Sequence, residues 1–119
     1  MPGDLTEHFS RIEFRCKCGK CDFDTVDAGL VLMLEKIRRH FNRPVTITSA
    51  CRCARHNQAV GGSTRSQHLY GRAADITVAG TQPADVADFA ETLNPGGLGR
   101  YATFTHIDSR TIGPARWNG

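Results

Sequence analysis

A helix-forming pattern that runs directly into a strand-forming pattern constrains the fold of this 119-residue chain most strongly. The spacing of the apolar side chains predicts an amphipathic helix over residues 26–41 that buries one face, with Asp24 or Thr25 as its N-cap. Pro44 ends this helix, and alternating β-branched residues at 45–48 predict a strand. The apolar positions of the helix are Val26, Leu30, Leu34, Ile37 and Phe41.

The rest of the chain continues this alternation. Residues 73–78 predict a second strand that Gly80 ends, and Pro83 in a first helical turn opens a second helix that stops at Asn94-Pro-Gly-Gly97. Residues 98–101 and 103–108 predict one or two further strands. The sum is an α+β fold, in which a small and mostly antiparallel sheet is flanked by two main helices.

The length predicts one domain over residues 1–119, which starts with an irregular, Cys-rich segment at 1–24. Residues 50–66, with the turn signal Gly61-Gly62-Ser63, predict a long loop. Near the end of the chain, the single tryptophan, Trp117, is expected to pack against the body of the domain.

Composition excludes several classes of protein. Hydrophobic residues make up 39% of the chain and charged residues 23%, as in ordinary globular domains. No stretch approaches the roughly 18 apolar residues of a membrane span, and the N-terminus lacks the basic and apolar regions of a secretory signal. The net charge of +3 comes from scattered arginines rather than from a basic stripe. We expect a monomer made in the cytoplasm, with neither a membrane nor a nucleic acid as partner.

The segment from Ser66 to Asp75 carries the clearest chemical signal. His68 and Asp75 are separated by Gly71, which fits a loop that turns back into a strand and presents an imidazole and a carboxylate to one point. His106, in a later strand-like segment, offers a third ligand. Two imidazoles and one carboxylate are a common catalytic zinc set that leaves a position for water. The alternative is that both histidines are structural, on the surface or hydrogen-bonded in the core.

Several short motifs occur along the chain in one order. They are Thr48-Ser-Ala-Cys-Arg52, His56-Asn57, Val60-Gly-Gly62, Ser66-x-His68, Gly71-x-Ala73-x-Asp75, Gly97-Leu-Gly99, Phe104-x-His-Ile-Asp108 and Ala115-Arg-Trp117. The chain thereby resembles the M15 family of zinc D-Ala-D-Ala peptidases, especially its short bacterial and phage members.

This resemblance implies a small α+β domain with a central antiparallel sheet, and it implies that His68, Asp75 and His106 bind zinc. It also implies peptidoglycan peptides as substrates, cut by a D-Ala-D-Ala carboxypeptidase or by a stem or crossbridge endopeptidase. Such a protein acts on the cell wall. Phage lysis or a virion is one context that would bring it there without a secretory signal.

The resemblance places Arg52 near the substrate, where its guanidinium group would hold a carboxylate or the developing oxyanion. The alternative is a surface ion pair. Many family members carry an acidic residue or a histidine shortly before the last zinc histidine, but Thr103 and Phe104 stand at these positions here and neither can act as a base. Asp108 would share one side of a strand with His106 and is the candidate base.

The alternative role for Asp108 is to accept a hydrogen bond from a zinc-bound imidazole. His56 is a further candidate for the base. The departure from the family pattern also leaves open a different function, in which the chain is a zinc-containing wall-binding or virion module with impaired catalysis.

Five cysteines are many for a chain of this length. Three interpretations compete: one or two disulfides that tie the N-terminal segment to the loop before the site, a structural zinc ion bound by four of the five, or free buried thiols. A disulfide or a bound zinc ion would hold Arg52 in place, because Arg52 lies between Cys51 and Cys53. The five are Cys16, Cys18, Cys21, Cys51 and Cys53.

Overall fold

The computed structural model describes residues 3–18, 21, 24–62, 66–111 and 113–119. Its elements, with 3₁₀ helices marked η, are η1 (Arg11–Phe14), α1 (Ala28–Phe41), β1 (Val45–Ser49), α2 (Ala54–Ala59), η2 (Gln67–Tyr70), β2 (Ala73–Val78), α3 (Pro83–Glu91), β3 (Gly97–Arg100), β4 (Thr105–Asp108) and β5 (Ala115–Asn118).

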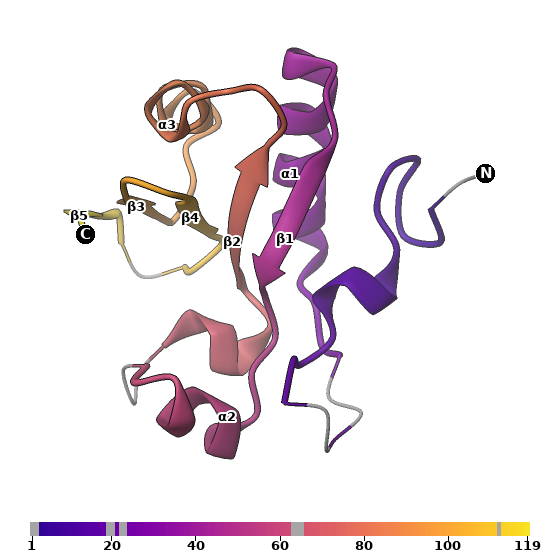
Figure 1. Ribbon diagram of the computed structural model, residues 1–119, viewed down its shortest axis with the longest axis vertical. Coiled ribbons are helices and arrows are strands. Elements are labelled where there is room, and N and C mark those ends of the chain that lie inside the picture. Colours follow the sequence, from indigo (N-terminus) through magenta and orange to yellow (C-terminus); the bar gives the residue numbers. More distant parts are fainter. Residues whose placement is uncertain (1–2, 19–20, 22–23, 63–65, 112) are drawn as a thin grey trace.

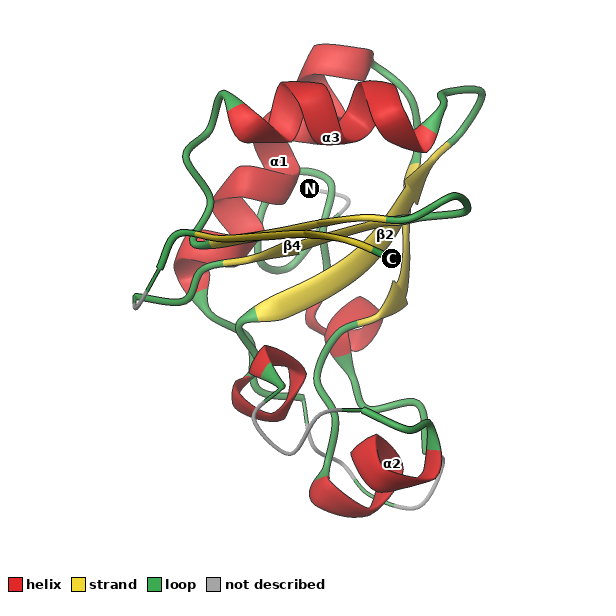
Figure 2. Ribbon diagram, turned by 90° about the vertical axis from the view of Figure 1, so that its left-hand side faces the viewer, coloured by secondary structure: helices red, strands yellow, loops and turns green. Residues whose placement is uncertain are grey.

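The strands form one sheet in the order β1-β2-β4-β3-β5. Helices α1 and α3 pack against the same face of this sheet, and α2 and η2 lie beyond its opposite face (Figures 1 and 2). All neighbouring strands are antiparallel except β3 and β5, which are parallel. The predicted α+β class and the mostly antiparallel sheet with two main helices are confirmed.

Helix α1 begins at Ala28 and not at residue 26, so the predicted N-caps are wrong. The side chain of Asp27 caps the helix by accepting a hydrogen bond from the backbone N–H of Leu30. Asn42, in the left-handed conformation with φ 52°, follows the last helical residue. The helix therefore ends where the sequence predicts.

Alternation along β2 and β4 separates the core from the functional face. Ala74, Ile76 and Ile107 belong to the hydrophobic core beneath the two helices. Asp75 and His106 are direct cross-strand partners and face the other side. The sheet thus brings a carboxylate and an imidazole together on the face away from α1 and α3.

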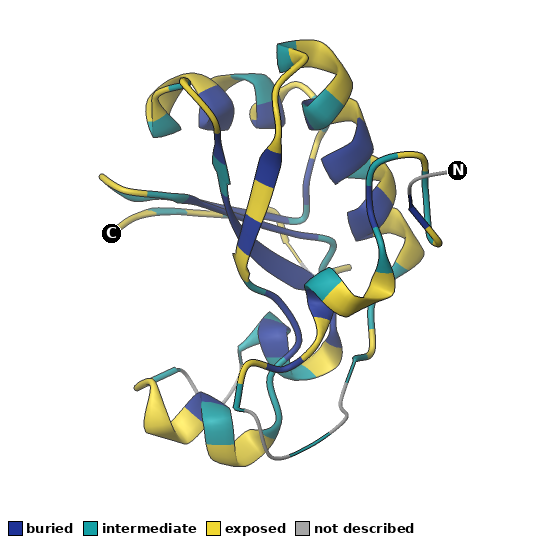
Figure 3. Cartoon of the chain, turned by 45° about the vertical axis from the view of Figure 1, so that its right-hand side comes forward, coloured by how far each residue is buried: buried dark blue, intermediate teal, exposed yellow. Residues whose placement is uncertain are grey.

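The core extends into the N-terminal segment, which the sequence pattern left irregular. Phe9 and Phe14 are almost fully buried and pack with the apolar face of α1. Figure 3 shows this buried zone as dark blue ribbon along α1 and through the middle of the sheet. No helix in the described part of the chain has the length and apolar character that a membrane span requires.

Two elements differ from the sequence prediction. Residues 54–59, which were expected within a long loop, form helix α2. The sulfur of Cys53 caps this helix by accepting a hydrogen bond from the backbone N–H of His56. Trp117 packs against the domain as expected, but it does so from strand β5, which pairs with β3 and makes the sheet mixed. Apolar periodicity gave no signal for either element.

Candidate metal and active site

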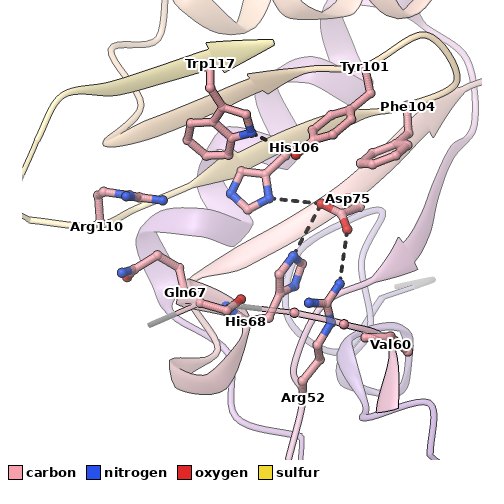
Figure 4. A pocket seen from close by; sticks show the side chains of 13 residues that line it. Arg52, Val60, Gln67, His68, Asp75, Tyr101, Phe104, His106, Arg110 and Trp117 are labelled. Carbon is pink, nitrogen blue, oxygen red and sulfur yellow. Dashed lines mark hydrogen bonds and ion pairs between the residues drawn. The ribbon is translucent and has the colours of Figure 1, made fainter. Parts of the chain in front are cut away.

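The structure brings His68, Asp75 and His106 to one point (Figure 4). His68 Nε2 lies 3.3 Å from Asp75 Oδ1, and His106 Nδ1 lies 3.0 Å from the same oxygen. One donor atom from each residue lies within 4.8 Å of the other two. The spacing that a single metal ion requires of its ligands is therefore present, as the sequence pattern predicted.

The turn between η2 and β2 sets the position of His68 relative to Asp75. Ser66 caps η2 by accepting a hydrogen bond from the backbone N–H of His68. Gly71 then reverses the chain with φ 67°, a conformation that L side chains rarely adopt. A side chain there would also meet the backbone of Thr25. Glycine at this position is required for both reasons.

In each histidine, the ring nitrogen that does not face Asp75 has a hydrogen-bond partner of its own. His68 Nδ1 lies 2.6 Å from the carbonyl oxygen of Ala50, and His106 Nε2 lies 2.8 Å from Asp108 Oδ2. When a metal ion binds, these two nitrogens carry the protons, because both partners are hydrogen-bond acceptors. His68 Nε2 and His106 Nδ1, which face the carboxylate of Asp75, are then the nitrogens left to bind the ion.

The donor set fits zinc. Two neutral imidazoles and a carboxylate are the protein ligands of many catalytic zinc sites, which keep a further position for water or substrate. Burial alone would raise the pKa of Asp75, but hydrogen bonds and charge interactions with His68 and His106 outweigh it and hold the pKa well below its usual range. The carboxylate is therefore ionised, as a metal ligand has to be.

Asp108 is fully buried, behind His106 as seen from the cavity. Its carboxylate also accepts hydrogen bonds from Arg110 Nε at 2.9 Å and Nη2 at 2.7 Å. Burial opposes ionisation, but the hydrogen bonds from His106 and Arg110 hold the pKa of Asp108 well below its usual range. This placement matches the second of its two predicted roles, that of a hydrogen-bond partner for a zinc-bound imidazole.

Arg52 lies at the edge of the site and is mostly buried. Its Nη2 is 3.6 Å from Asp75 Oδ2, its Nε donates to Ser49 Oγ at 3.2 Å, and its Nη1 donates to Asn57 Oδ1 at 3.2 Å. The side chain is 13% exposed, so its ion pair with Asp75 is not a surface pair. Its backbone N–H also donates to the carbonyl oxygen of His68.

A cavity of about 530 Å³ opens in front of these residues. Arg52, His68, Asp75 and His106 line it, whereas Asp108 and His56 are not among its described lining residues. One wall is aromatic, because Tyr101 stacks on Phe104 with ring centroids 4.2 Å apart. The cavity is thus bounded by charged groups at its base and by aromatic rings beside them.

Among the lining residues that the sequence did not place in the site are Tyr101, Arg110 and Trp117. Trp117 Nε1 donates to Tyr101 Oη at 2.8 Å, and its ring centroid lies 4.9 Å from that of His106. Gly99 was the sequence signal for the position of Trp117. Gly99 pairs with both His106 and Trp117 in the sheet, and a Cβ at this position would lie 2.6 Å from the indole ring. A glycine within a strand marks such a close approach.

All five cysteines are among the described residues, and no disulfide links them. Cys51 is buried, and burial raises the pKa of its thiol to about 11, so it is a neutral core side chain. The other four gather at one point, with one sulfur from each within 4.8 Å of the others, and none of them is among the described residues that line the cavity.

Comparison with known proteins agrees with this geometry. The family model described as peptidase M15 matches residues 7–108, which include all three residues of the His68–Asp75–His106 cluster. The chain is 40% identical over 68 residues to the probable peptidoglycan L,D-endopeptidase MepK of Haemophilus influenzae, a match that covers 55% of this chain and 35% of that protein.

The chain is also 31% identical over 99 residues to the zinc D-Ala-D-Ala carboxypeptidase of Streptomyces albus G, a match that covers 75% of this chain and 38% of that protein. The matched region thus spans little more than a third of either relative. With a family model that matches most of its length, the chain belongs to the peptidase M15 family.

Proposed function

We propose that this chain is a zinc-dependent peptidase that hydrolyses peptide bonds of peptidoglycan, with His68, Asp75 and His106 as the metal ligands. The convergence of His68 Nε2, Asp75 Oδ1 and His106 Nδ1 carries this proposal. The two relatives support the substrate class, since one is a probable peptidoglycan endopeptidase and the other a D-Ala-D-Ala carboxypeptidase. We propose the cell wall as the site of action. The expected monomer and the expected phage context stay predictions.

A zinc ion held by these ligands would polarise the scissile carbonyl group and activate water for attack on it. The protein residues around it keep the ligands in place. The carbonyl of Ala50 and the carboxylate of Asp108 fix the two imidazole rings, and Arg110 in turn fixes Asp108. Asp108 is therefore a positioning residue in this proposal.

Arg52 would bind a negatively charged oxygen of the substrate. Three contacts already orient its guanidinium group, and a guanidinium has five N–H groups, so donors remain for a ligand in the cavity. A substrate carboxylate or the developing oxyanion suits this planar fork. Because Arg52 lies next to Asp75, its positive charge would lie beside a carbonyl group bound at the metal ion.

Tyr101 would supply a second, neutral donor. Its hydroxyl oxygen accepts a hydrogen bond from Trp117 Nε1, which can only donate. The Tyr101 O–H is then left to donate to another group, and the residue lines the cavity. We assign it to a substrate oxygen or to the leaving amine.

One observation favours a second candidate function. Among the described residues that line the cavity, Asp75 is the only carboxylate, and it belongs to the metal cluster. A chain without a separate carboxylate base would bind wall peptides through zinc and Arg52 with little hydrolysis. This is the wall-binding module that the sequence left open.

Digestion of purified muropeptides separates the two functions. The protein is incubated with them as purified, after chelation, and after zinc is restored, and the products are identified by mass spectrometry. The peptidase predicts cleavage of one stem or crossbridge bond that is lost with chelator, restored by zinc and absent in His68→Ala. Zinc-loaded protein that pulls down with cell-wall sacculi but cuts no bond would instead establish the binding module.

A further inference from the structure

Four cysteine side chains from two distant segments meet outside the described lining of the cavity. Cys16, Cys18 and Cys21 come from the N-terminal segment, and Cys53 caps α2. One sulfur from each lies within 4.8 Å of all the others. We propose that these four thiolates bind a structural zinc ion, at a site separate from the His68–Asp75–His106 cluster.

The sulfur spacing fits tetrahedral zinc. Zinc–sulfur bonds of about 2.3 Å place two sulfurs of a tetrahedron about 3.8 Å apart. Cys18 Sγ and Cys21 Sγ lie 3.4 Å apart. A disulfide would require a separation of about 2.05 Å. The group is therefore arranged around a common centre and not as bonded pairs.

Backbone N–H groups point at two of the sulfurs. The N–H of Cys53 donates to Cys16 Sγ at 3.3 Å, and the N–H of His56 donates to Cys53 Sγ at 3.4 Å. Hydrogen bonds to sulfur favour the thiolate, which is the form that binds metal. They also hold the sulfurs in place, as groups around a metal site commonly do for its ligands.

Local charge and side-chain burial agree with this assignment. Four thiolates and one Zn²⁺ carry a net charge of about −2. Arg15 and Lys17 flank Cys16, and Arg15 Nη2 donates to the carbonyl oxygen of Cys21 at 3.3 Å. Cys16 is buried, and the other three are partly exposed, so an ion can reach the site.

A metal ion here would fix the strand end and turn that carry the active-site residues. Cys53 directly follows Arg52, and Ala50, two residues earlier than Arg52, accepts the hydrogen bond from His68 Nδ1. The N–H of Cys51 donates to the carbonyl oxygen of Phe14 in the N-terminal segment. The cysteine site would therefore clamp that segment onto the turn behind the cavity.

Metal content tests the proposal directly. The chain is purified under reducing conditions and its zinc is measured by mass spectrometry against protein concentration. We expect two zinc ions per chain in the unmodified protein. The double variant Cys18→Ser with Cys21→Ser should bind one zinc ion, and so should the double variant His68→Ala with His106→Ala. Cys51→Ala, the matched control at the cysteine outside the group, keeps two. Unchanged zinc content in the folded Cys18/Cys21 variant overturns the proposal.

The two sites fail independently. One zinc that is lost in the histidine variant and kept in the Cys18/Cys21 variant overturns the cysteine site and leaves the proposed function standing. One zinc with the opposite pattern supports the cysteine site and overturns the assigned ligands of the peptidase.

Cobalt substitution gives a readout that does not depend on folding of a cysteine variant. Cobalt bound to thiolates absorbs intensely in the near ultraviolet, whereas cobalt bound by imidazole and carboxylate does not. We expect this absorption in the unmodified protein and, with equal intensity, in the variant with both His68 and His106 replaced by alanine. Its absence from the unmodified, cobalt-loaded and reduced protein overturns the proposal.

Discussion

His106 is the residue through which most of the site is connected. It faces Asp75 through Nδ1 and Asp108 through Nε2, and its ring lies against Trp117. Its neighbours therefore decide which nitrogen is available to a metal ion.

Asp108→Asn tests the positioning role. Loss of the carboxylate charge weakens the hold on the His106 ring, and such changes behind a metal ligand typically cost 10–100-fold in metal affinity or activity. We expect the zinc dissociation constant, measured by competition with a chelating dye, to rise by about that factor. Asp88→Asn, which removes a carboxylate from an exposed ion pair with Arg100, should change nothing. Unchanged zinc affinity together with a large loss of rate would make Asp108 the base.

Arg52→Lys tests the substrate contact. Lysine keeps the positive charge but loses the planar fork and its fixed hydrogen bonds. A charged hydrogen bond is worth about 1.5–3 kcal/mol, so kcat/KM should fall by about 10–100-fold while zinc content stays the same. Arg55→Lys, at an exposed position on α2, is the matched control. Full activity in the Arg52 variant would remove Arg52 from the reaction.

At the scale of elements, the sequence prediction and the structure differ at the N-terminus of α1, where Asp27 is the N-cap. Asp27 accepts hydrogen bonds from the N–H of Leu30 and from Ser109 Oγ. Asp27→Ala should lower the free energy of unfolding by about 1 kcal/mol, as measured by urea denaturation. Asp24→Ala, at a cap position that the sequence favoured, should have a much smaller effect. The reverse order of the two effects would show that the helix starts earlier.

Long periodic elements were predictable, and short elements fixed by tertiary contacts were not. The apolar stripe of α1 and the β-branched run of β1 each carry a local signal, as does the start of α3 at Pro83. Helix α2 has six residues and no apolar stripe, and it depends on the capping sulfur of Cys53. Strand β5 depends on the room that Gly99 leaves for Trp117.

The same distinction applies to the site. The convergence of His68, Asp75 and His106 could be predicted from the sequence, because their residue types occur in an ordered series of motifs, while their role as metal ligands stays a proposal. Tyr101 and Arg110 could not, because their roles come from contacts with Trp117 and Asp108 that only the folded sheet creates. The buried position of Asp108 likewise follows from packing and not from its place two residues after His106.

At the scale of the whole molecule, Glu35 joins the N-terminal segment to α1. Burial disfavours its ionised form, but hydrogen bonds from His8 and Arg39 outweigh this and lower the pKa of Glu35 from 4.5 to about 2. Glu7, which is exposed, lies close to His8 and Arg39, with its Oε2 atom 3.7 Å from His8 Nδ1 and 3.2 Å from Arg39 Nη2. A carboxylate with a lowered folded-state pKa stabilises the chain above its ordinary pKa and loses that effect as the pH falls.

Glu35→Gln should therefore reduce stability at pH 7, and the difference from the unmodified protein should shrink as the pH falls from about 4.5 toward 2. Urea denaturation of the two proteins across this pH range measures the free energy of unfolding of each. Asp75 and Asp108 titrate in both proteins, so the comparison isolates Glu35. Parallel pH profiles would show that the contact between Glu35 and His8 contributes nothing to folding.

Anomalous diffraction at the zinc absorption edge, from crystals of the zinc-loaded protein, locates the metal ion itself. If His68, Asp75 and His106 are the ligands, a peak lies about 2.0–2.2 Å from His68 Nε2, His106 Nδ1 and a carboxylate oxygen of Asp75, with an open position toward the cavity. A zinc-loaded crystal with no peak between these three side chains would contradict this ligand assignment.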